Sequence, residues 1–478
     1  MKYEAVIGLE VHLHLNTKTK AFCGCSTEFG KEPNSQVCPV CLGFPGSLPV
    51  FNQAALDYSI KVALALNCKV QEYTKFDRKN YFYPDLPKNY QISQYDLPLS
   101  LQGYLDIELE GVRKRIGITR VHMEEDAGKL IHQDDSTLVD FNRAGISLLE
   151  IVSEPDINSP EEAYEYLSSL KSTIQYLDVS DCDMEKGSLR CDANISLRPV
   201  GSKTLGIKTE LKNMNSFKGV KEALSYEIKR QAKILSCGET LMQETRLWDA
   251  KSLETVSMRT KEGAKDYRYF PEPDLPPFVI QKEKIEQIRA TLPELPREKM
   301  RRFIKEYGLS EYDAKVLIGS KRASEFSEEA MKKFPDKNKK PVANWIIGPL
   351  AALAGNRNCE IHELKISTDH LIGLIELVEK KQVISNLTGK AVLEEMSKTG
   401  KAAQKIVEEK KLAQISDSGS LSIVIEEVIK ENPKSVADFN VGKANALMFL
   451  VGQVMRKSSG KANPKVVQEL LKERLKGA

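Results

Sequence analysis

The spacing of apolar residues changes near residue 296 of this 478-residue chain. Up to about residue 290, apolar and polar residues alternate in short runs broken by Gly, Pro and Asn, as in half-buried β-strands. After Pro296 apolar residues recur three and four positions apart, as in DHLIGLIELVEKKQVI, which is typical of helices. A second break, KLAQISDSGS, precedes another helical stretch. A chain of this length is also too long to fold around a single hydrophobic core. We therefore predict an α+β fold with an antiparallel sheet in a domain at 1–292, an all-α domain at 293–408 and a small all-α tail domain at 409–478.

Charge is balanced over the whole chain but not at its C-terminus. The 70 basic and 67 acidic residues give a net charge of +3, which indicates no class of partner. Residues 440–478, in contrast, hold eight Lys or Arg against two Glu. Such a run is usually a solvated helical face, but a basic terminal domain also suits the backbone of a nucleic acid. Both interpretations stay open on charge alone.

Neither export nor membrane insertion is expected. No stretch approaches 18 consecutive apolar residues, and the start, MKYEAVIGLEVHL, lacks the apolar run of a signal peptide. Five of the nine cysteines are scattered singly, which suits a reducing compartment better than a disulfide framework. We expect a cytoplasmic protein with no membrane partner.

The other four cysteines form two close pairs near the N-terminus, Cys23 with Cys25 and Cys38 with Cys41. Two such turns separated by a short loop can supply the four thiolates of a tetrahedral zinc site, here a knuckle at 23–41. Two disulfides or four unrelated core thiols are the alternatives. A site of four thiolates is closed and structural, so any chemistry must be sought elsewhere.

Several predicted strands have apolar side chains on one face and ionisable side chains on the other. In EAVIGLEVHLHL, alternation separates Ile7, Leu9 and Val11 from Glu10 and His12. SLRCDANISLRP repeats the pattern with Arg190 and Asp192 on its polar side, and GIKTELK does so with Lys208 and Glu210 opposite Ile207. HMEEDAGK ends a further run in acidic residues, and Glu150 lies within SLLEIVSEPD. For any single strand, a half-buried sheet with a solvated face explains the pattern.

Five such segments within about 220 residues indicate that their acidic residues share one polar surface of the sheet. Clustered carboxylates repel one another, and cations between them would offset that repulsion. Carboxylate oxygens with one imidazole suit magnesium or manganese. The interspersed Lys79, Arg190, Lys208 and Lys212 would favour phosphates nearby. A divalent metal ion together with basic side chains is typical of sites that catalyse phosphoryl transfer.

The familiar nucleotide and hydrolase motifs are absent. The nearest P-loop candidate, from Gly201 to Gly206, has Ile207 where the motif requires Lys, and no G-x-G-x-x-G follows a strand. Nor is there a G-x-S-x-G elbow or a Gly/Ser-rich amidase tract. ATP, if it is used, must bind on the sheet through metals, and nucleophilic hydrolysis is not expected.

Two tyrosine-rich segments mix aromatic rings with Arg or Lys: KFDRKNYFYPDLPKNYQISQYD at residues 75–96 and AKDYRYFPEPDLPP at 264–277. Such mixtures can stack exposed bases and contact phosphates. Aromatic loops fixed by Pro also commonly cap a core, and the sequence favours neither interpretation.

Six motifs together give the chain a close resemblance to the GatB family, the B subunits of the bacterial glutamyl/aspartyl-tRNA amidotransferases. They are IGLEVH, KFDRKNYFYPD, HMEEDAGK, GSLRCDANISLRP, ELKNMNSF and DYRYFPEPDLP. The C-terminal FLVGQVMRKSSGKANPK resembles the tail domain of that family, so the resemblance spans nearly the whole chain. It implies a cradle-like catalytic domain related to the glutamine synthetase fold.

The resemblance also implies an enzymatic function, that of a carbon–nitrogen ligase. Such proteins use ATP to phosphorylate the side-chain carboxylate of Glu on tRNA(Gln), or of Asp on tRNA(Asn), and ammonia then displaces the phosphate. The ammonia comes from glutamine hydrolysed in a separate amidase (glutaminase) subunit, and a third, small subunit joins the two. The implied cofactors are ATP, Mg²⁺ and Zn²⁺, and the implied partners are the amidase subunit, the small subunit and the misacylated tRNA.

Residue roles carry over from the resemblance by position. Magnesium would be held by Glu10, His12, Glu125, Glu150 and Glu210. Lys79, Arg190 and Lys208 would bind the nucleotide, and Glu10, Glu125, Lys79 and Asp192 would be catalytic. Alternation places Glu124 on the face opposite Glu125, so Glu124 is not in this set.

Two other functions remain open from the sequence. A metal-dependent ligase of small molecules, acting alone, would need only ATP and free ammonia. A zinc-bearing tRNA-binding protein without enzymatic activity would transfer no phosphoryl group. Which misacylated tRNA is served is not encoded in any motif.

Overall fold

The computed structural model describes residues 2–260, 266–413, 418–441, 443–458 and 462–476. The chain forms two compact units, 1–296 and 297–478. The first is mixed α and β and is built on a large, mainly antiparallel sheet, whereas the second contains helices and no named strand among its described residues. This confirms the predicted α+β class and the all-helical C-terminal region.

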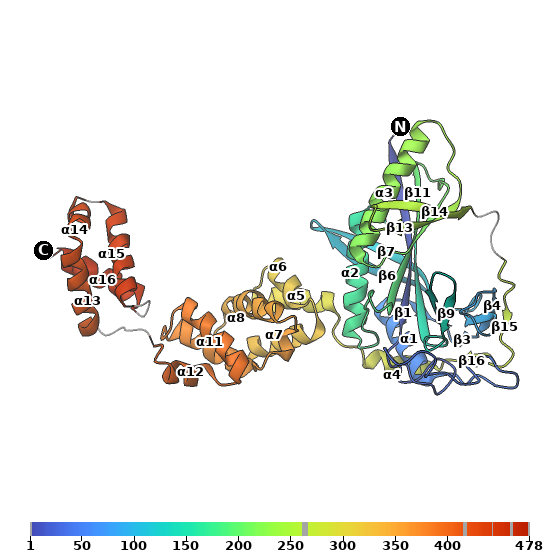
Figure 1. Ribbon diagram of the computed structural model, residues 1–478, viewed down its shortest axis with the longest axis horizontal. Coiled ribbons are helices and arrows are strands. Elements are labelled where there is room, and N and C mark those ends of the chain that lie inside the picture. Colours follow the sequence, from blue (N-terminus) through green and yellow to red (C-terminus); the bar gives the residue numbers. More distant parts are fainter. Residues whose placement is uncertain (1, 261–265, 414–417, 442, 459–461, 477–478) are drawn as a thin grey trace. The chain divides into compact units, whose positions relative to one another are not determined.

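The first unit is organised around a nine-stranded sheet in the order β14-β13-β12-β11-β1-β10-β7-β6-β2 (Figure 1). Its pairs are antiparallel except for β12 and β13, which run parallel. The strands of this sheet are β1 (Tyr3–His14), β2 (Lys69–Val70), β6 (Ser100–Leu109), β7 (Val112–Glu125), β10 (Ser147–Ser153), β11 (Leu189–Pro199), β12 (Thr209–Lys212), β13 (Glu244–Asp249) and β14 (Glu254–Thr260).

Smaller sheets and, among the described residues of this unit, four helices complete the fold around the large sheet. The small sheets pair β15 (Phe270–Pro271) with β4 (Asp77–Asn80) and β4 with β5 (Tyr90–Ser93), β16 (Phe278–Val279) with β3 (Tyr73–Thr74), and β8 (Lys129–His132) with β9 (Thr137–Asp140). The helices are α1 (Gln53–Ala65), α2 (Pro160–Tyr176), α3 (Phe217–Ser236) and α4 (Lys282–Ala290).

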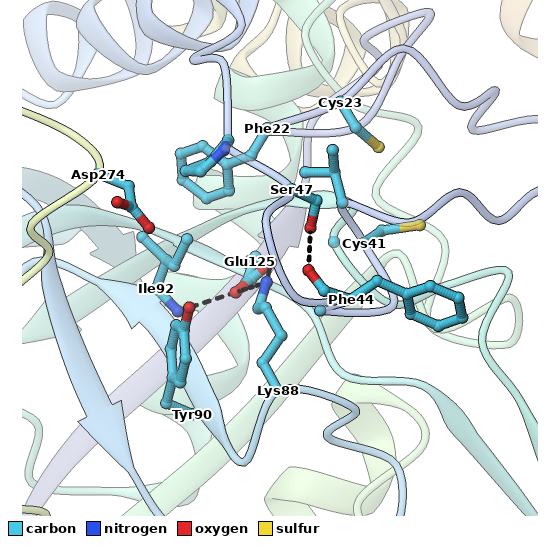
Figure 2. A pocket seen from close by; sticks show the side chains of 14 residues that line it. Phe22, Cys23, Cys41, Phe44, Ser47, Lys88, Tyr90, Ile92, Glu125 and Asp274 are labelled. Carbon is cyan, nitrogen blue, oxygen red and sulfur yellow. Dashed lines mark hydrogen bonds and ion pairs between the residues drawn. The ribbon is translucent and has the colours of Figure 1, made fainter.

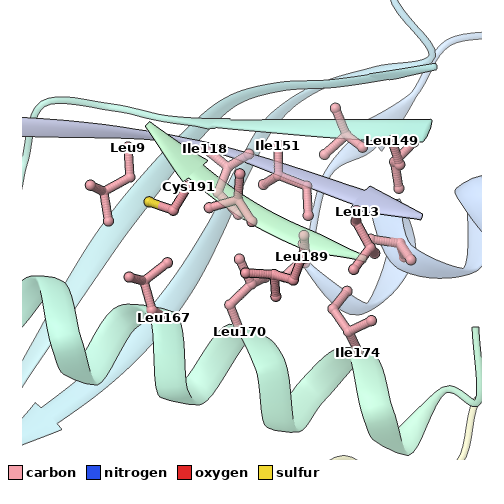
Figure 3. Packing of buried hydrophobic residues seen from close by; sticks show 14 of the residues in the cluster. Leu9, Leu13, Ile118, Leu149, Ile151, Leu167, Leu170, Ile174, Leu189 and Cys191 are labelled. Atoms are coloured by element: carbon pink, nitrogen blue, oxygen red, sulfur yellow. The ribbon is translucent and has the colours of Figure 1, made fainter. Parts of the chain in front are cut away.

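Helices α2 and α3 cover one face of the large sheet (Figure 1). Each begins at a serine cap: Ser159 Oγ accepts a hydrogen bond from the Glu162 N–H, and Ser216 Oγ accepts one from the Gly219 N–H. Figure 3 shows side chains of α2 pointing at the apolar residues of the strands; those labelled are Leu167, Leu170 and Ile174 on the helix and Leu9, Leu13, Ile118, Leu149, Ile151, Leu189 and Cys191 on the sheet. Burying each large side chain stabilises the fold by about 1.5–3 kcal/mol. This packing leaves the polar side of the central strands on the opposite face.

The strand alternation predicted from sequence agrees with the burial, except at one end of β12. Ile7, Leu9 and Val11 on β1 are fully buried, as is Leu211 on β12. The prediction is wrong for Ile207, which is 41% exposed because β12 begins only at Thr209.

The second unit consists of short helices around two clusters of buried apolar side chains. One cluster runs from Phe303 to Val407 and the other from Leu421 to Leu475. The helical segments are α5 (Pro296–Tyr307), α6 (Glu311–Leu317), α7 (Lys321–Lys333), α8 (Lys340–Trp345), η1 (Ile346–Leu350), α9 (Ala351–Asn356), η2 (Ile361–Glu363), α10 (Thr368–Ile375), η3 (Glu376–Lys380), α11 (Asn386–Thr399), α12 (Ala403–Glu409), α13 (Ser418–Glu431), α14 (Pro433–Asn440), α15 (Ala444–Lys457) and α16 (Pro464–Lys476). Among the described helices, none combines the length and apolar character needed to cross a membrane.

Candidate functional site

Five adjacent strands, β12, β11, β1, β10 and β7, bring their polar residues to one face of the large sheet. Directly paired residues share a face, so the register shows which side chains meet. His12 lies between Arg190 and Glu150, and Glu10 lies opposite Asp192. The pairs Glu150–His122 and Asn194–Glu210 extend the same face on either side.

The centre of this face is a cluster of His12, Glu124 and Glu150. His12 Nε2 is 3.5 Å from Glu150 Oε2 and 3.8 Å from Glu124 Oε1, and one potential ligand atom from each residue lies within 4.8 Å of the others. Both carboxylates are buried. Two carboxylates and one imidazole at this spacing are a donor set that suits a hard divalent cation.

The electrostatics of the cluster indicate crowded negative charge. Burial, together with the charges of Glu150 and Asp192, raises the pKa of Glu10. Burial alone would raise the pKa of Glu150, but His122 and His12 hold it well below its usual range. Burial alone would lower the pKa of His12, but the hydrogen bond and charge of Glu150 raise it. A divalent cation among these residues would offset the repulsion.

His122 lies beside the cluster, although it is not among the site residues predicted from the motifs. Its Nε2 is 3.1 Å from Glu150 Oε2, and its buried Nδ1 has no hydrogen-bond partner among the described residues. The sequence does hold a sign of this position. His122 and Glu124 are two residues apart in HMEED, and residues two apart on a strand have side chains on the same face of the sheet.

Glu125 lies away from the cluster, on the other side of β7. Lys88 Nζ is 2.6 Å from its carboxylate, and the Ile92 N–H donates a 2.9 Å hydrogen bond to Glu125 Oε1. Glu125, Cys23 and Cys41 are among the residues that line a cavity of about 120 Å³, and Figure 2 shows Lys88 pointing at the Glu125 carboxylate there. Alternation therefore separates two neighbouring acids, and Glu124, not Glu125, lies beside His12 and Glu150.

The remaining predicted acids lie beside the cluster, and two of them are paired with a lysine. Lys212 forms ion pairs with Asp192 and, at 3.2 Å, with Glu210. The Thr245 hydroxyl also donates to Glu210 Oε2 at 2.8 Å. Glu10 accepts a 2.8 Å hydrogen bond from Asn194 Nδ2. Glu10, Asp192 and Glu210 thus share the polar face without joining the three-residue cluster.

The predicted nucleotide-binding cations occupy three different surroundings. Lys79 has no carboxylate within 4.0 Å among the described residues; burial alone would lower its pKa, but the charges of Glu124 and Glu150 raise it. Arg190 is ion-paired with the buried Asp126, which His14 Nε2 also contacts at 2.6 Å. Lys208 lines a second cavity, of about 250 Å³, together with Glu10.

The four predicted zinc ligands come together. Their sulfur atoms lie within 4.8 Å of one another, and no disulfide joins them. The Cys38 and Cys41 sulfurs are 3.9 Å apart, close to the separation of about 3.8 Å expected around zinc with bonds of about 2.3 Å. The Cys23 thiol, the Cys38 N–H and the Lys20 ammonium hold the pKa of Cys41 at about 4, against burial, which alone would raise it.

Lys20 is a feature of the thiol cluster that the sequence did not reveal. Its side chain is fully buried, and its Nζ donates to Cys41 Sγ at 3.6 Å and to the Phe141 carbonyl at 3.2 Å. Burying an ammonium group costs free energy unless the group is paired with an anion. Thiolate character at Cys41 provides that anion and accounts for the buried position of Lys20. The donor set fits zinc.

Comparison with known proteins covers nearly the entire chain. Residues 5–286 match the family model described as the GatB/GatE catalytic domain, and residues 325–475 match the one described as the GatB domain. Relatives named as aspartyl/glutamyl-tRNA(Asn/Gln) amidotransferase B subunits are similar from end to end. The relative from Carboxydothermus hydrogenoformans is 58% identical over 99% of both chains. The relative from Caldanaerobacter subterraneus subsp. tengcongensis is also 58% identical, over 99% of this chain and 100% of the relative.

A third relative, from Thermodesulfovibrio yellowstonii, is 55% identical over 100% of both chains and carries the same name. The family expected from the sequence motifs is thereby confirmed. Both the extended match to the catalytic-domain model and the full-length relatives lead to one conclusion: the chain belongs to the GatB family of aminoacyl-tRNA amidotransferase B subunits.

Proposed function

We propose that this chain performs the ATP-dependent step of transamidation on Glu-tRNA(Gln), Asp-tRNA(Asn) or both. The observation that carries the proposal is the cluster of His12 with the buried carboxylates of Glu124 and Glu150 on the polar face of the sheet. The names of the full-length relatives supply the reaction class, and the sheet with one covered and one polar face supports a cradle like that of glutamine synthetase.

His12, Glu124 and Glu150 would hold Mg²⁺, which supplies charge neutralisation for phosphoryl transfer when bound. His122 holds the Glu150 carboxylate in place. Lys79 is the proposed phosphate contact, because its ammonium has no ion-pair partner among the described residues. Arg190 is ion-paired with Asp126 and would contact the nucleotide at the edge of its site. Lys208 would contact the nucleotide from the cavity that it lines together with Glu10.

The proposed reaction has two steps, formation of an acyl phosphate and its conversion to the amide. A side-chain carboxylate oxygen of the misacylated amino acid attacks the γ-phosphorus of ATP, which forms an acyl phosphate and releases ADP. Ammonia then attacks the acyl carbon, and inorganic phosphate leaves with that oxygen. The acyl phosphate must meet ammonia before water hydrolyses it, so we expect the site to be enclosed at an interface with another subunit.

The proposal extends to partners, zinc and domains. Ammonia would come from a glutaminase subunit, with a third, small subunit in the same cytoplasmic complex. Cys23, Cys25, Cys38 and Cys41 would bind a structural zinc ion, and their thiol state suits a reducing compartment. Domains at 1–292, 293–408 and 409–478 are supported by the three separate clusters of buried apolar residues.

Amidation by the purified three-subunit complex tests this function. Glu150→Gln keeps the shape of the side chain but removes its charge, so ATP-dependent amidation of misacylated tRNA should fall at least about 100-fold. Glutamine hydrolysis in the glutaminase subunit should survive. The matched control is Glu239→Gln, at an exposed carboxylate outside the site.

Three outcomes contradict the proposal in different ways. Full amidation by Glu150→Gln would remove the metal assignment. ATP turnover with ammonia that ignores tRNA would favour a ligase acting alone. Tight tRNA binding with no phosphoryl transfer by the wild-type complex would favour a non-enzymatic protein.

A further inference from the structure

The two tyrosine-rich segments, far apart in the sequence, form one structure beside the acidic cluster. Phe270 of β15 pairs with Arg78 of β4. The Asn80 N–H donates to the Tyr267 carbonyl at 2.9 Å, and Asn80 Nδ2 donates to the Arg268 carbonyl at 2.7 Å. Hydrogen bonds to its backbone therefore fix the second segment against the first.

The aromatic side chains of this region divide into two groups. Phe22, Phe51, Phe76 and Phe278 pack on one another with ring centroids 5.0–6.1 Å apart, and Phe76 is 1% exposed. These phenylalanines cap the core. Of these four, Phe76 belongs to the first tyrosine-rich segment, so the interpretation of a core cap holds for that residue, whereas the tyrosines described next do not join this group.

Four tyrosines form a second group, which we call the tyrosine row: Tyr81, Tyr267, Tyr269 and Tyr95. Successive ring centroids are 5.9, 6.1 and 4.1 Å apart. Tyr269 and Tyr95 are stacked, with an angle of 5° between their planes, and Tyr95 is 51% exposed. The row thus runs from the partly buried Tyr81 to a stacked pair in which Tyr269 is partly buried and Tyr95 is exposed.

The inner end of the row lies next to the acidic cluster. The Tyr81 hydroxyl donates to Gln91 Oε1 at 3.3 Å, and Gln91 Nε2 donates to the Glu125 carbonyl at 2.7 Å. Ser93, on the same short strand as Gln91, has its Oγ 3.4 Å from Glu124 Oε2. Lys79 Nζ lies 5.3 Å from the centroid of the Tyr267 ring. The row therefore leads from solvent to the residues proposed to hold metal and phosphate.

A flat, stacked aromatic pair beside a lysine that has no ion-pair partner among the described residues suits unpaired nucleobases joined by phosphates. We propose that the tyrosine row binds the unpaired 3′ end of the tRNA, with Tyr95 as the exposed stacking platform. This inference rests on the proposed function, because the esterified amino acid at that end must reach the acidic cluster.

Fluorescence of a labelled tRNA tests the stacking. A transcript with 2-aminopurine as its 3′-terminal base is titrated with the three-subunit complex, and the quenching of that base reports stacking. Tyr95→Ala should abolish most of the quenching and weaken binding of the intact transcript about tenfold. Tyr95→Phe keeps the ring and should restore both. The matched control is Tyr73→Ala, at a tyrosine that is also 51% exposed but lies outside the row.

A second measurement separates a stacking role from a structural one. The affinity of a tRNA that lacks its unpaired 3′ nucleotides should be the same for wild type and Tyr95→Ala, because the contact under test is absent. Quenching in Tyr95→Ala equal to wild type, or equal loss of affinity for intact and trimmed tRNA, would overturn the inference. Quenching by a wild-type complex that performs no ATP-dependent amidation would instead contradict the proposed function and leave the stacking intact.

Discussion

Glu124 and Glu125 are neighbours on β7, yet they have different surroundings. Glu124 faces His12 across the polar floor, with 3.8 Å between the nearest atoms, whereas Glu125 forms an ion pair with Lys88. The period of two along a strand accounts for this difference. Motif matching alone favoured Glu125 as a ligand, because a motif does not show which face of the sheet a residue joins.

A pair of substitutions at these two acids tests the metal site at the scale of single residues. Glu124→Gln should weaken binding of Mn²⁺, measured by electron paramagnetic resonance, at least about 100-fold, because a proposed direct ligand is lost. Glu125→Gln should leave the Mn²⁺ affinity within about twofold, since its carboxylate lies outside the cluster. The reverse order of effects would return Glu125 to the ligand set.

Zinc content tests the thiol cluster. Elemental analysis should find about one zinc per chain in the wild type and a clear loss in Cys38→Ser, because three thiolates hold zinc less tightly than four. Cys237→Ser is the control, since Cys237 is exposed and lies outside the cluster. Wild-type protein that is fully folded and free of zinc would show that the four sulfurs are only packed together.

At the scale of elements, alternation was informative and strand order was not. It predicted the buried faces of β1 and β11, because each residue's face follows from its position in its own strand. The partnership of His122 with Glu150 depends on β10 lying beside β7, which no local pattern encodes. The parallel pairing of β12 with β13 also escaped prediction, since helix α3 carries the chain between them.

One ion-pair network joins two helices of the second unit. Glu328 of α7 lies 3.1 Å from Lys299 and 3.0 Å from Arg302, both on α5, and 2.6 Å from Lys332 on its own helix. Burial alone would raise the pKa of Glu328, but hydrogen bonds from Lys332, Arg302 and Lys299 lower it to about 2. Because the folded-state pKa is depressed, this carboxylate stabilises the fold above its unfolded pKa of about 4.3, and that contribution is lost as pH falls toward 2.

Urea denaturation followed by circular dichroism tests this linkage. Glu328→Gln should lower the free energy of unfolding by about 1–2 kcal/mol at pH 7, because three cations lose their shared partner. Its effect should shrink steadily below pH 4.5 relative to the wild type. Glu379→Gln, at an exposed carboxylate of the same unit, is the control. A loss of stability that is independent of pH would show that the charge of Glu328 is not its source.

At the scale of the whole molecule, the sequence predicted the transition from sheet to helix correctly. Along the chain, the boundary between the two compact units falls after residue 296, where the period of the apolar pattern changes. The tail has its own cluster of buried apolar residues, from Leu421 to Leu475. The function came from motifs spread along the chain, because tRNA and partner proteins leave no periodic signal in a sequence.

Removal of the tail tests its role in the whole protein. A chain that ends at residue 410 should bind tRNA more weakly, and the logarithm of its affinity should fall less steeply with the logarithm of salt concentration. Tail cations such as Lys457 and Arg474 have ion-pair partners within the tail, but exposed pairs are weak enough to exchange for phosphate. An unchanged salt slope would remove the tail from the tRNA interface.

The central claim is that a side-chain carboxylate of the tRNA-bound amino acid is phosphorylated by ATP before ammonia arrives. It is tested most directly by labelling that carboxylate with ¹⁸O and analysing the inorganic phosphate released during amidation. We predict one ¹⁸O atom in the phosphate from the wild-type complex, because the carboxylate oxygen leaves on phosphorus. Amide formed at the full rate together with unlabelled phosphate would contradict it.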